Sequence, residues 1–338
     1  MSIELRTRAP RRAKISALGT YVPPRILNNA DLAKLVDTSD EWIMQRLGIR
    51  ERHLVEPGMA TSDMAVEAAR RCLAERGVQP NEVEVVIVAT VTPDMLFPAT
   101  ACLVQDKLGA RGAWGFDLSA ACSGFLYALQ VGAKLVESGV HSKVLVIGAD
   151  TMSSIIDYTD RTTCVIFGDG AGAVLVEPAE EGEVGLIDFR HEIDGSGAAA
   201  LNMPAGGSRC PASPQTIEER MHYVHQDGQA VYKYAVRKMV ETSSKLLEAN
   251  HISASDLSCF IPHQANKRII LSTAERLGLP LERVIINIDR FGNTTAATIP
   301  LAMQTALDEH RLKKDSLVLL ASVGAGFTVG ACLLRWEM

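Results

Sequence analysis

Residues 114–129 read Trp-Gly-Phe-Asp-Leu-Ser-Ala-Ala-Cys-Ser-Gly-Phe-Leu-Tyr-Ala-Leu, and they place one thiol between two regular elements. The first five residues predict a buried strand, and the residues from Gly124 to about Ser138 predict an amphipathic helix. Cys122 therefore lies at a helix start, where unpaired backbone N–H groups and the positive end of the macrodipole favour a thiolate. A thiolate attacks carbonyl carbons, so Cys122 is a candidate nucleophile, although a lone cysteine more often packs as a small hydrophobic residue.

The same succession of helices and strands occurs twice along the chain. A predicted helix at 64–75 and strand at 83–88 have counterparts in a helix at 235–249 and a strand at 257–261. The later elements continue in order: strand 115–118 matches 284–288, the helix after Cys122 matches 296–310, strand 143–147 matches 316–320, and Gly-Ala-Gly at 170–172 matches 324–326, each followed by a strand. Two similar units with buried strands between helices indicate an α/β fold made by duplication, with active-site residues at the junction.

Composition limits the possible partners. The chain has 338 residues, a net charge of −6 and a pI near 5.8, which argues against nucleic acid as a general partner. Its seven cysteines are scattered without a C-x-x-C pair, which is typical of a reducing cytoplasm and indicates neither a disulfide framework nor a zinc site. No apolar run reaches the roughly 18 residues needed to span a membrane. Residues 1–13 carry four arginines and predict a flexible basic arm.

Two further patterns resemble binding motifs but predict ordinary structure. Residues 168–173 fit a relaxed dinucleotide fingerprint, yet residues 174–178 predict a strand where that fingerprint requires a helix. These glycines instead indicate either a close approach between two backbones or a tight turn beside a site. Cys210, His222 and His225 are possible metal ligands, but their segment is rich in Pro, Ser and Gly and predicts a solvated loop, so we expect no metal.

Six segments together resemble a known family. They are Thr-Ser-Asp-Glu-Trp-Ile at 38–43, Asp-Leu-Ser-Ala-Ala-Cys-Ser-Gly at 117–124, Phe-Gly-Asp-Gly-Ala-Gly at 167–172, Pro-His-Gln-Ala-Asn at 262–266, Phe-Gly-Asn-Thr-Thr-Ala at 291–296 and Gly-Ala-Gly-Phe-Thr at 324–328. In this order, and over Lys14 to the C-terminus, they resemble the β-ketoacyl-acyl-carrier-protein synthase III family. The resemblance implies a thiolase-like fold, with an N-terminal half at 14–183 and a C-terminal half at 184–338 in a layered α/β/α/β/α arrangement, and a homodimer.

The resemblance also implies an activity. Members of the family condense a short acyl-coenzyme A primer with malonyl-acyl-carrier protein, with loss of CO2, to give 3-oxoacyl-acyl-carrier protein and start fatty acid synthesis. By resemblance Cys122 is the nucleophile that carries the acyl group, and His263 and Asn293 donate hydrogen bonds to the enolate. The backbone N–H groups of Cys122 and Ala325 form the oxyanion hole. Coenzyme A enters as a substrate, and no cofactor is expected.

The remaining binding residues follow from the same resemblance: Trp42, Arg46, Arg161 and Asn266 for coenzyme A, Lys267 and Arg268 for the acidic carrier protein, and Phe97 for the dimer interface, where it floors the partner's acyl tunnel. Leu47 and Thr162 stand where relatives usually have Thr and Gly beside the nucleotide, which leaves the primer donor open. Primer length depends on packing around Phe97, Leu201 and Met203. The alternatives are a starter-unit ketosynthase or acyltransferase of secondary metabolism, and a non-catalytic scaffold that binds acyl chains.

Overall fold

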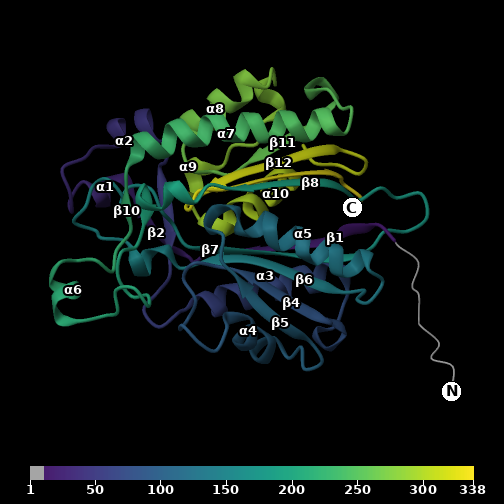
Figure 1. Cartoon of the computed structure of the whole chain (residues 1–338), viewed down its shortest axis with the longest axis horizontal. Helices are drawn as coiled ribbons and strands as arrows, with labels where there is room; N and C mark the ends of the chain where they lie inside the picture. The colour runs from purple at the N-terminus through teal and green to yellow at the C-terminus, as the bar shows by residue number, and fades with distance from the viewer. Residues whose placement is uncertain (1–10) are drawn as a thin grey trace.

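The computed structural model describes residues 11–338 and shows alternating layers of helices and sheets (Figure 1). Helices α3 (Thr61–Arg76) and α4 (Thr100–Leu108) cover the outer face of the first sheet. Helices α5 (Gly124–Glu137) and α10 (Thr298–Asp308) lie between the two sheets, and α7 (Gly228–Ala249) and α8 (Lys267–Arg276) cover the outer face of the second. This order is the predicted α/β/α/β/α arrangement.

The first sheet has the strand order β1-β7-β6-β4-β5. Its strands are β1 (Ala13–Tyr21), β4 (Val85–Ala89), β5 (Trp114–Leu118), β6 (Val144–Asp150) and β7 (Gly170–Pro178). Strands β5, β4 and β6 run parallel, whereas β7 is antiparallel to both β6 and β1. Strands β4 and β6 are buried along their whole length because helices cover both faces, which explains their continuous apolar sequences.

The second sheet repeats this order as β8-β13-β12-β11. Its strands are β8 (Leu186–Ile193), β11 (Cys259–Pro262), β12 (Leu317–Gly324) and β13 (Thr328–Arg335). The strand predicted at 284–288 is wrong, because only one isolated parallel bridge, between Phe260 and Val284, occupies its place. The chain leaves the sheet after Ile285, whose N–H donates to the Phe260 carbonyl. The Asn287 N–H then donates to Gln264 Oε1, and helix α9 (Ile288–Phe291) follows.

Strand β5 exists as predicted, but its burial was predicted wrongly. Within residues 11–338 it forms one edge of the first sheet, where only β4 pairs with it. Trp114 consequently keeps 49% of its surface exposed, and Phe116 to Leu118 are only partly buried. Apolar composition alone does not distinguish an edge strand from a central one.

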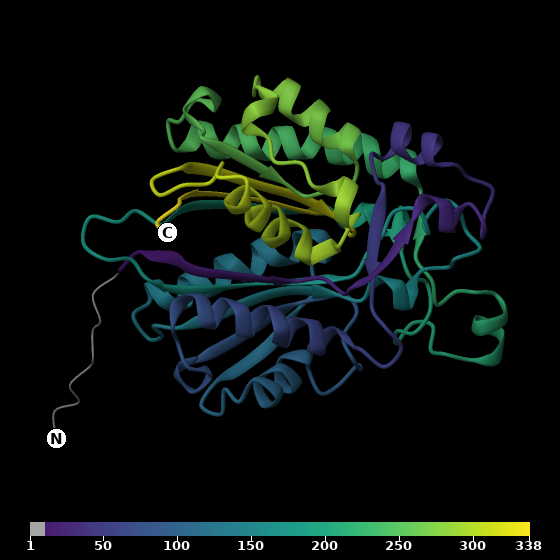
Figure 2. The same ribbon diagram turned by 180° about the vertical axis from the view of Figure 1, so that it is seen from behind.

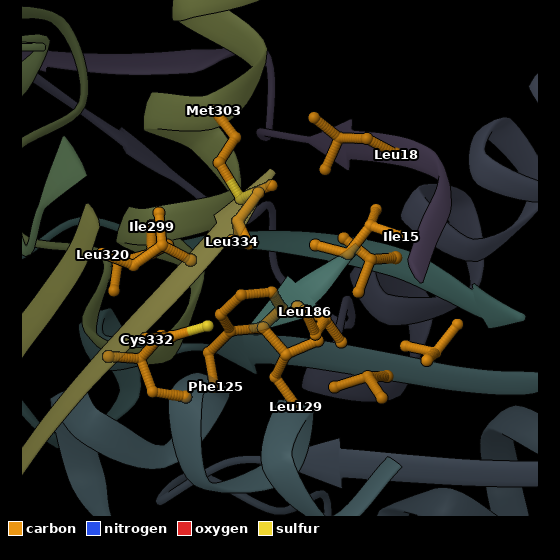
Figure 3. Close-up of a cluster of buried hydrophobic side chains, with 14 of the residues drawn as sticks. Ile15, Leu18, Phe125, Leu129, Leu186, Ile299, Met303, Leu320, Cys332 and Leu334 are labelled. Carbon is orange, nitrogen blue, oxygen red and sulfur yellow. The ribbon is translucent and has the colours of Figure 1, made fainter. Parts of the chain in front are cut away.

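The largest hydrophobic cluster lies between the two sheets and joins the halves (Figure 3). Phe125 and Leu129 of α5 and Ile299 and Met303 of α10 meet side chains from both sheets there. A Cβ added to Gly172 would lie 2.2 Å from Pro300 Cβ, so this glycine allows β7 and α10 the close approach predicted from the sequence. Burying each large side chain contributes about 1.5–3 kcal/mol, so the halves stabilise one another.

Two smaller groups of elements lie beside the ends of the sheets (Figure 2). The first comprises β2 (Arg25–Asn28) paired with β3 (Glu51–Leu54), α1 (Asn29–Leu32) and α2 (Asp40–Arg46). The second comprises β9 (Leu201–Asn202) paired with β10 (His225–Gln226), and α6 (Pro214–Glu218). Within the described residues, no helix is long and apolar enough to cross a membrane.

The predicted ends of the two halves lie in loops or at strand starts. Residues 1–10 of the predicted arm lie outside the described residues. Ala13 already begins β1, and the Arg11 side chain donates to the Val136 carbonyl at 3.0 Å, so the last part of the predicted arm is held against the body. The division at 183/184 falls in the connection between β7 and β8 and stays a prediction.

Candidate active site

The three candidate catalytic side chains come together at one cavity. Cys122, His263 and Asn293 are all buried and all line a cavity of about 530 Å³. Cys122 lies in the 3₁₀ turn η2 (Ala121–Ser123) between β5 and α5, His263 follows β11, and Asn293 lies between α9 and the 3₁₀ turn η7 (Thr295–Ala297). The site therefore draws one residue from the first half of the chain and two from the second.

Strands of the second half hold the turn that carries Cys122. Ser322 Oγ donates to the Cys122 carbonyl at 2.8 Å, and Thr328 Oγ1 donates to the Ala120 carbonyl at 2.8 Å. Gly324 lies so close that an added Cβ would stand 2.7 Å from the Cys122 nitrogen. The position of the thiol therefore depends on the contact between the two halves.

The resting thiol is neutral, which contradicts the expectation that the helix start favours a thiolate. Burial raises the pKa of Cys122 to about 12, and the Asp150 carboxylate raises it further. A hydrogen bond from the Asn293 side chain and the Cys122 backbone N–H act in the opposite direction but do not compensate. Loss of water around the thiolate outweighs the helix start, because desolvation penalises the charged form of a fully buried group.

The His263 ring is neutral and has one free nitrogen. Burial lowers its pKa to about 3. Nδ1 lies 2.5 Å from Thr298 Oγ1, whereas Nε2 is buried without a partner in the described part of the chain. When the Thr298 hydroxyl donates to Nδ1, the ring proton lies on Nε2, so Nε2 is a donor. Thr298 was not predicted from the sequence, because nothing in the local pattern connects it with a histidine 35 residues away.

Asn293 is oriented by hydrogen bonds on both its backbone and its side chain. Its N–H donates to the Ile166 carbonyl at 3.0 Å, and its carbonyl accepts from the Gly168 N–H at 3.0 Å. Its Oδ1 accepts from the Thr295 N–H at 2.9 Å. Because Oδ1 is occupied, the amide nitrogen is the group turned to Cys122.

Asp150 is a buried carboxylate beside this site that sequence reasoning missed. Its Oδ1 accepts from the Val91 N–H at 2.7 Å and from two threonine hydroxyls, and its Oδ2 accepts from the Ala296 N–H at 3.1 Å. Burial raises its pKa to about 6. The sequence contained one indication of this buried group, namely a charged residue at the end of an otherwise apolar strand. Asp150 joins the end of the first sheet to the turn that follows Asn293.

Three of the four predicted coenzyme A residues line the cavity. Trp42, Arg46 and Asn266 line it, and the Arg161 guanidinium stands 4.7 Å from the centre of the Trp42 ring. Arg161 also lies 3.6 Å from Asp37. Because the Arg161 and Trp42 side chains contact each other, a planar ring enters between them only when one of them moves.

The two positions that depart from the usual family pattern also line the cavity. Thr162 Oγ1 donates to the Asp160 carboxylate at 2.7 Å, so its hydroxyl is already engaged. Leu47 contributes an apolar side chain, and its carbonyl accepts from the Lys267 N–H at 2.9 Å. At these two positions the cavity is therefore lined by an apolar side chain and by a hydroxyl that is already hydrogen-bonded.

The predicted docking residues begin helix α8 and are exposed. The Lys267 side chain packs against Gly48, and the Arg268 guanidinium stands 5.5 Å from the centre of the Tyr232 ring. Arg268 also lines the cavity mouth. Arg268 therefore lies at the cavity, whereas Lys267 is not among the residues that line it, and a docking role for both stays a prediction.

A second, apolar hollow of about 160 Å³ extends from Cys122. It is lined by Val91, Ala121, Met152, Ile155, Phe167, Leu201, Asn202, Met203, Val224, Thr295 and Ala325 as well as the thiol. Leu201 and Met203 thus lie where they were expected. Phe97 does not line this hollow within the single chain and is 84% exposed.

The rejected motifs have structural explanations. Residues 174–178 lie in a strand as predicted, but strand β7 already begins at Gly170, within the glycine-rich run. His222 Nε2 lies 2.8 Å from Thr216 Oγ1. Over residues 11–338, no cluster of three His, Cys, Asp or Glu side chains is placed to hold a metal ion.

Comparisons with known proteins agree with the geometry. Two family models match, "3-Oxoacyl-[acyl-carrier-protein (ACP)] synthase III" over residues 116–195 and its C-terminal counterpart over 247–336. A β-ketoacyl-[acyl-carrier-protein] synthase III of Koribacter versatilis is 66% identical over 96% of this chain and 98% of that protein. One of Chlorobium chlorochromatii is 50% identical over 96% and 100%.

Solved structures give the same result. A 3-oxoacyl-[acyl-carrier-protein] synthase III of Aquifex aeolicus is 42% identical, with a TM-score of 0.88 over 96% of this chain and 100% of that one. The priming β-ketosynthase of the R1128 polyketide pathway is 35% identical, with a TM-score of 0.90 over 99% of both chains. The two curated relatives, which match this chain over nearly its full length at up to 66% identity, are both β-ketoacyl-acyl-carrier-protein synthases III, and the solved structures share its thiolase-like fold. The chain therefore belongs to the β-ketoacyl-acyl-carrier-protein synthase III family.

Proposed function

We propose that this acyltransferase condenses a short acyl-coenzyme A primer with malonyl-acyl-carrier protein, releasing CO2 and giving the 3-oxoacyl-acyl-carrier protein that initiates fatty acid synthesis. The observation that carries the proposal is the meeting of a buried thiol, a neutral imidazole and an oriented amide at one cavity. Two neutral donors beside a nucleophile suit a reaction that passes through an enolate.

In the first half-reaction, the Cys122 sulfur attacks the thioester carbonyl of the primer. The carbon–sulfur bond to coenzyme A breaks, and the proton of the Cys122 thiol ends on the departing coenzyme A sulfur. The backbone N–H groups of Cys122 and Ala325 hold the oxygen of the tetrahedral intermediate. The product is a neutral acyl-Cys122 thioester, which the apolar hollow accommodates without burying a charge.

In the second half-reaction, malonyl-acyl-carrier protein loses CO2 and leaves an enolate on its thioester oxygen. His263 Nε2 and the Asn293 amide nitrogen donate hydrogen bonds to that oxygen. Neither donor is acidic enough to protonate the carbon nucleophile, whereas a carboxylate at either position would repel the charge. The enolate carbon attacks acyl-Cys122, a carbon–carbon bond forms, and the Cys122 thiolate departs and regains a proton.

The proposal is tested by mixing the protein with a panel of acyl-coenzyme A thioesters and measuring intact mass, then adding malonyl-acyl-carrier protein. We expect one acyl group per chain, followed by its loss and the appearance of the 3-oxoacyl product. Acylation only from acyl-carrier proteins would instead favour a starter-unit ketosynthase, an alternative supported by Leu47 and Thr162 at the cavity mouth. Absence of any acylation would favour a non-catalytic scaffold.

Replacing Thr298 by Val should slow condensation by about tenfold, equivalent to about 1.4 kcal/mol of transition-state free energy. The valine keeps the shape of the side chain but removes the hydroxyl that, by donating to Nδ1, would hold the His263 proton on Nε2. Steady-state kcat for condensation provides the measurement. Thr298→Ser should restore most of the rate, and a Val variant as active as the parent would contradict this role of the hydroxyl.

We further propose a homodimer whose interface includes Phe97. Met95, Leu96 and Phe97 form a run of exposed apolar side chains, and Trp114 is exposed on the edge strand β5. Such a patch is typical of an interaction surface, and an unpaired strand edge favours pairing with a second copy. From the partner, Phe97 would close the apolar hollow that it does not reach within its own chain.

Phe97→Asp should therefore convert the dimer to a monomer, because it places a charge in an apolar interface. Light scattering at micromolar concentration measures the mass. A parent protein that is already monomeric would contradict the proposed dimer, and an unchanged dimer would exclude Phe97 from its interface.

Arg268 and Lys267 are proposed to attract the acidic carrier protein. Arg268→Glu should raise the KM for malonyl-acyl-carrier protein and flatten its salt dependence, because charges at an interface rim mainly steer association. Acylation by coenzyme A thioesters should remain nearly unchanged. Equal loss in both half-reactions would assign Arg268 to the primer entrance, which its place at the cavity mouth also allows.

The proposed reaction uses coenzyme A only as a substrate and needs no cofactor, because acyl transfer and decarboxylation require only the thiol and hydrogen-bond donors. The proposed compartment is the cytoplasm, because all seven cysteines remain unpaired.

A further inference from the structure

Arg52, in the middle of β3, is a fully buried cation that the proposed reaction does not use. Burial lowers its pKa to about 10, so it remains protonated at neutral pH. In the described part of the chain it forms no ion pair, and its Nε has no hydrogen-bond partner. Neutral acceptors hold its charge instead.

These acceptors belong to segments that are far apart in the sequence. Nη1 donates to Asn29 Oδ1 at 2.6 Å, and Nη2 donates to the Val165 carbonyl. Both are buried contacts, and they join the start of α1 to the segment before β7. A guanidinium suits this position because its donors point in fixed directions.

The Val165 contact lies next to the segment that orients Asn293. Ile166 accepts the Asn293 N–H and Gly168 donates to the Asn293 carbonyl, so this segment and Asn293 form a short parallel ladder. The aliphatic part of Arg52 packs against the same ladder. A Cβ added to Gly292 would lie 3.1 Å from Arg52 Cγ, and one added to Gly168 would lie 3.3 Å from Arg52 Cβ.

The Asn29 contact leads in the other direction, to the helix that carries Trp42. Asn29 Nδ2 donates to Asp40 Oδ1 at 2.7 Å and to the Ile49 carbonyl at 2.8 Å. Asp40 is exposed and begins α2. Arg52 thus contacts the Asn293 ladder directly, and it is linked to α2 through the side-chain amide of Asn29.

We propose that Arg52 is a positioning residue for the decarboxylation step, which it supports by fixing the turn that carries Asn293. The inference rests on the proposed role of Asn293 as a donor to the enolate. The Arg52 guanidinium fixes the ladder by its hydrogen bond to the Val165 carbonyl. The aliphatic part of the Arg52 side chain fixes it by packing against Gly292. Acyl transfer to Cys122 should depend much less on this turn, because the proposed oxyanion donors of that step are the backbone N–H groups of Cys122 and Ala325.

The principal test is Arg52→Lys, which keeps the positive charge but cannot bond to Asn29 and Val165 in the same fixed geometry. We expect CO2 release from malonyl-acyl-carrier protein to fall by about tenfold to a hundredfold in kcat, because a misplacement near 1 Å has effects of this size. KM for the carrier and the rate of Cys122 acylation should change by less than twofold. Asp40→Ala, the control, removes the link to α2 and a charge near Arg52 but leaves the hydrogen bonds from Arg52 to Asn29 and Val165, and it should leave decarboxylation near the parent rate.

A double-mutant cycle separates positioning from a general loss of structure. If Arg52 acts through Asn293, adding Arg52→Lys to Asn293→Ala should reduce decarboxylation no further. A further loss as large as in the single variant would overturn the inference, as would a parent-like rate for Arg52→Lys alone. If Asn293→Ala itself retains full decarboxylation, the proposed function of Asn293 fails and not merely the role of Arg52.

Asn29→Ala provides the same test if Arg52→Lys does not fold. It removes the side-chain acceptor of Nη1 while leaving the Arg52 stem and the contact with Val165 in place. We expect a severalfold fall in kcat for decarboxylation that again disappears in the Asn293→Ala background. Unchanged decarboxylation by a folded Asn29→Ala protein would overturn the inference.

Discussion

Cys122→Ala is expected to abolish acylation by acyl-coenzyme A. The sulfur is the atom proposed to form the thioester, so no other group in the cavity replaces it. Intact-protein mass after incubation with a short acyl-coenzyme A should show the parent gaining one acyl group and the variant gaining none. Condensation with malonyl-acyl-carrier protein should disappear as well, because it consumes the acyl-Cys122 intermediate.

Two controls make this prediction specific. Cys102 is the exposed cysteine and Cys164 and Cys259 are buried, so peptide mapping that found the acyl group on any of them would contradict the assignment. Cys122→Ser should also lose acylation, because a hydroxyl is a much weaker acid and a poorer nucleophile than a thiol. Because burial raises the thiol pKa to about 12, alkylation of Cys122 in the free protein should accelerate steadily as the pH rises from 7 to about 10.

His263→Ala and Asn293→Ala should each lower decarboxylation of malonyl-acyl-carrier protein by about 10²- to 10³-fold, the usual effect of removing one donor to a developing oxyanion. Both variants should retain much of the acyl transfer to Cys122, because these side chains are assigned to the enolate. Release of CO2 and intact mass measure the two half-reactions separately. Unimpaired CO2 release by either variant would contradict the division of roles.

Replacing Asn293 by a carboxylate tests whether this position must donate a hydrogen bond to the enolate. Asn293→Asp conserves the size of the side chain but substitutes a carboxylate for the donor, so it should lower decarboxylation at least as much as Asn293→Ala does. Lowering the pH toward the pKa of the new carboxyl should recover some activity, since the neutral acid can donate a hydrogen bond. A variant with the activity of the parent would show that the amide does not contact the enolate.

Much of the architecture could be predicted because its causes are local. Apolar runs such as Val85–Ala89 predict strands, and helical periodicity locates α3 and α7. The duplication follows from the repeated order of these elements and predicted the matching order of the two sheets. The strand predicted at 284–288 was wrong because a distant residue bonds this stretch instead of a neighbouring strand. The Gln264 side chain, more than 20 positions away, donates to the Ile285 carbonyl and accepts from the Asn287 N–H.

The candidate site could be predicted in its residues but not in its electrostatics. Cys122, His263 and Asn293 stand out by their motifs, and the structure brings them together. The helix start indicated a thiolate, whereas the second half of the chain buries the thiol and Asp150 adds a negative charge beside it. Sequence position gives the direction of the macrodipole, but the loss of solvent depends on everything packed around the sulfur.

The sequence by itself thus determined the order of elements, their duplication and the three residues at the cavity, since these depend on short-range patterns and on motifs. Only the tertiary structure decided that the thiol rests neutral, that Thr298 orients His263, that Arg52 supports the turn of Asn293, and that Phe97 lies exposed. Each of these features comes from contacts or burial involving residues distant in the chain. The free energy of a buried charge or hydrogen bond is set by its surroundings, and no local stretch of sequence contains those surroundings.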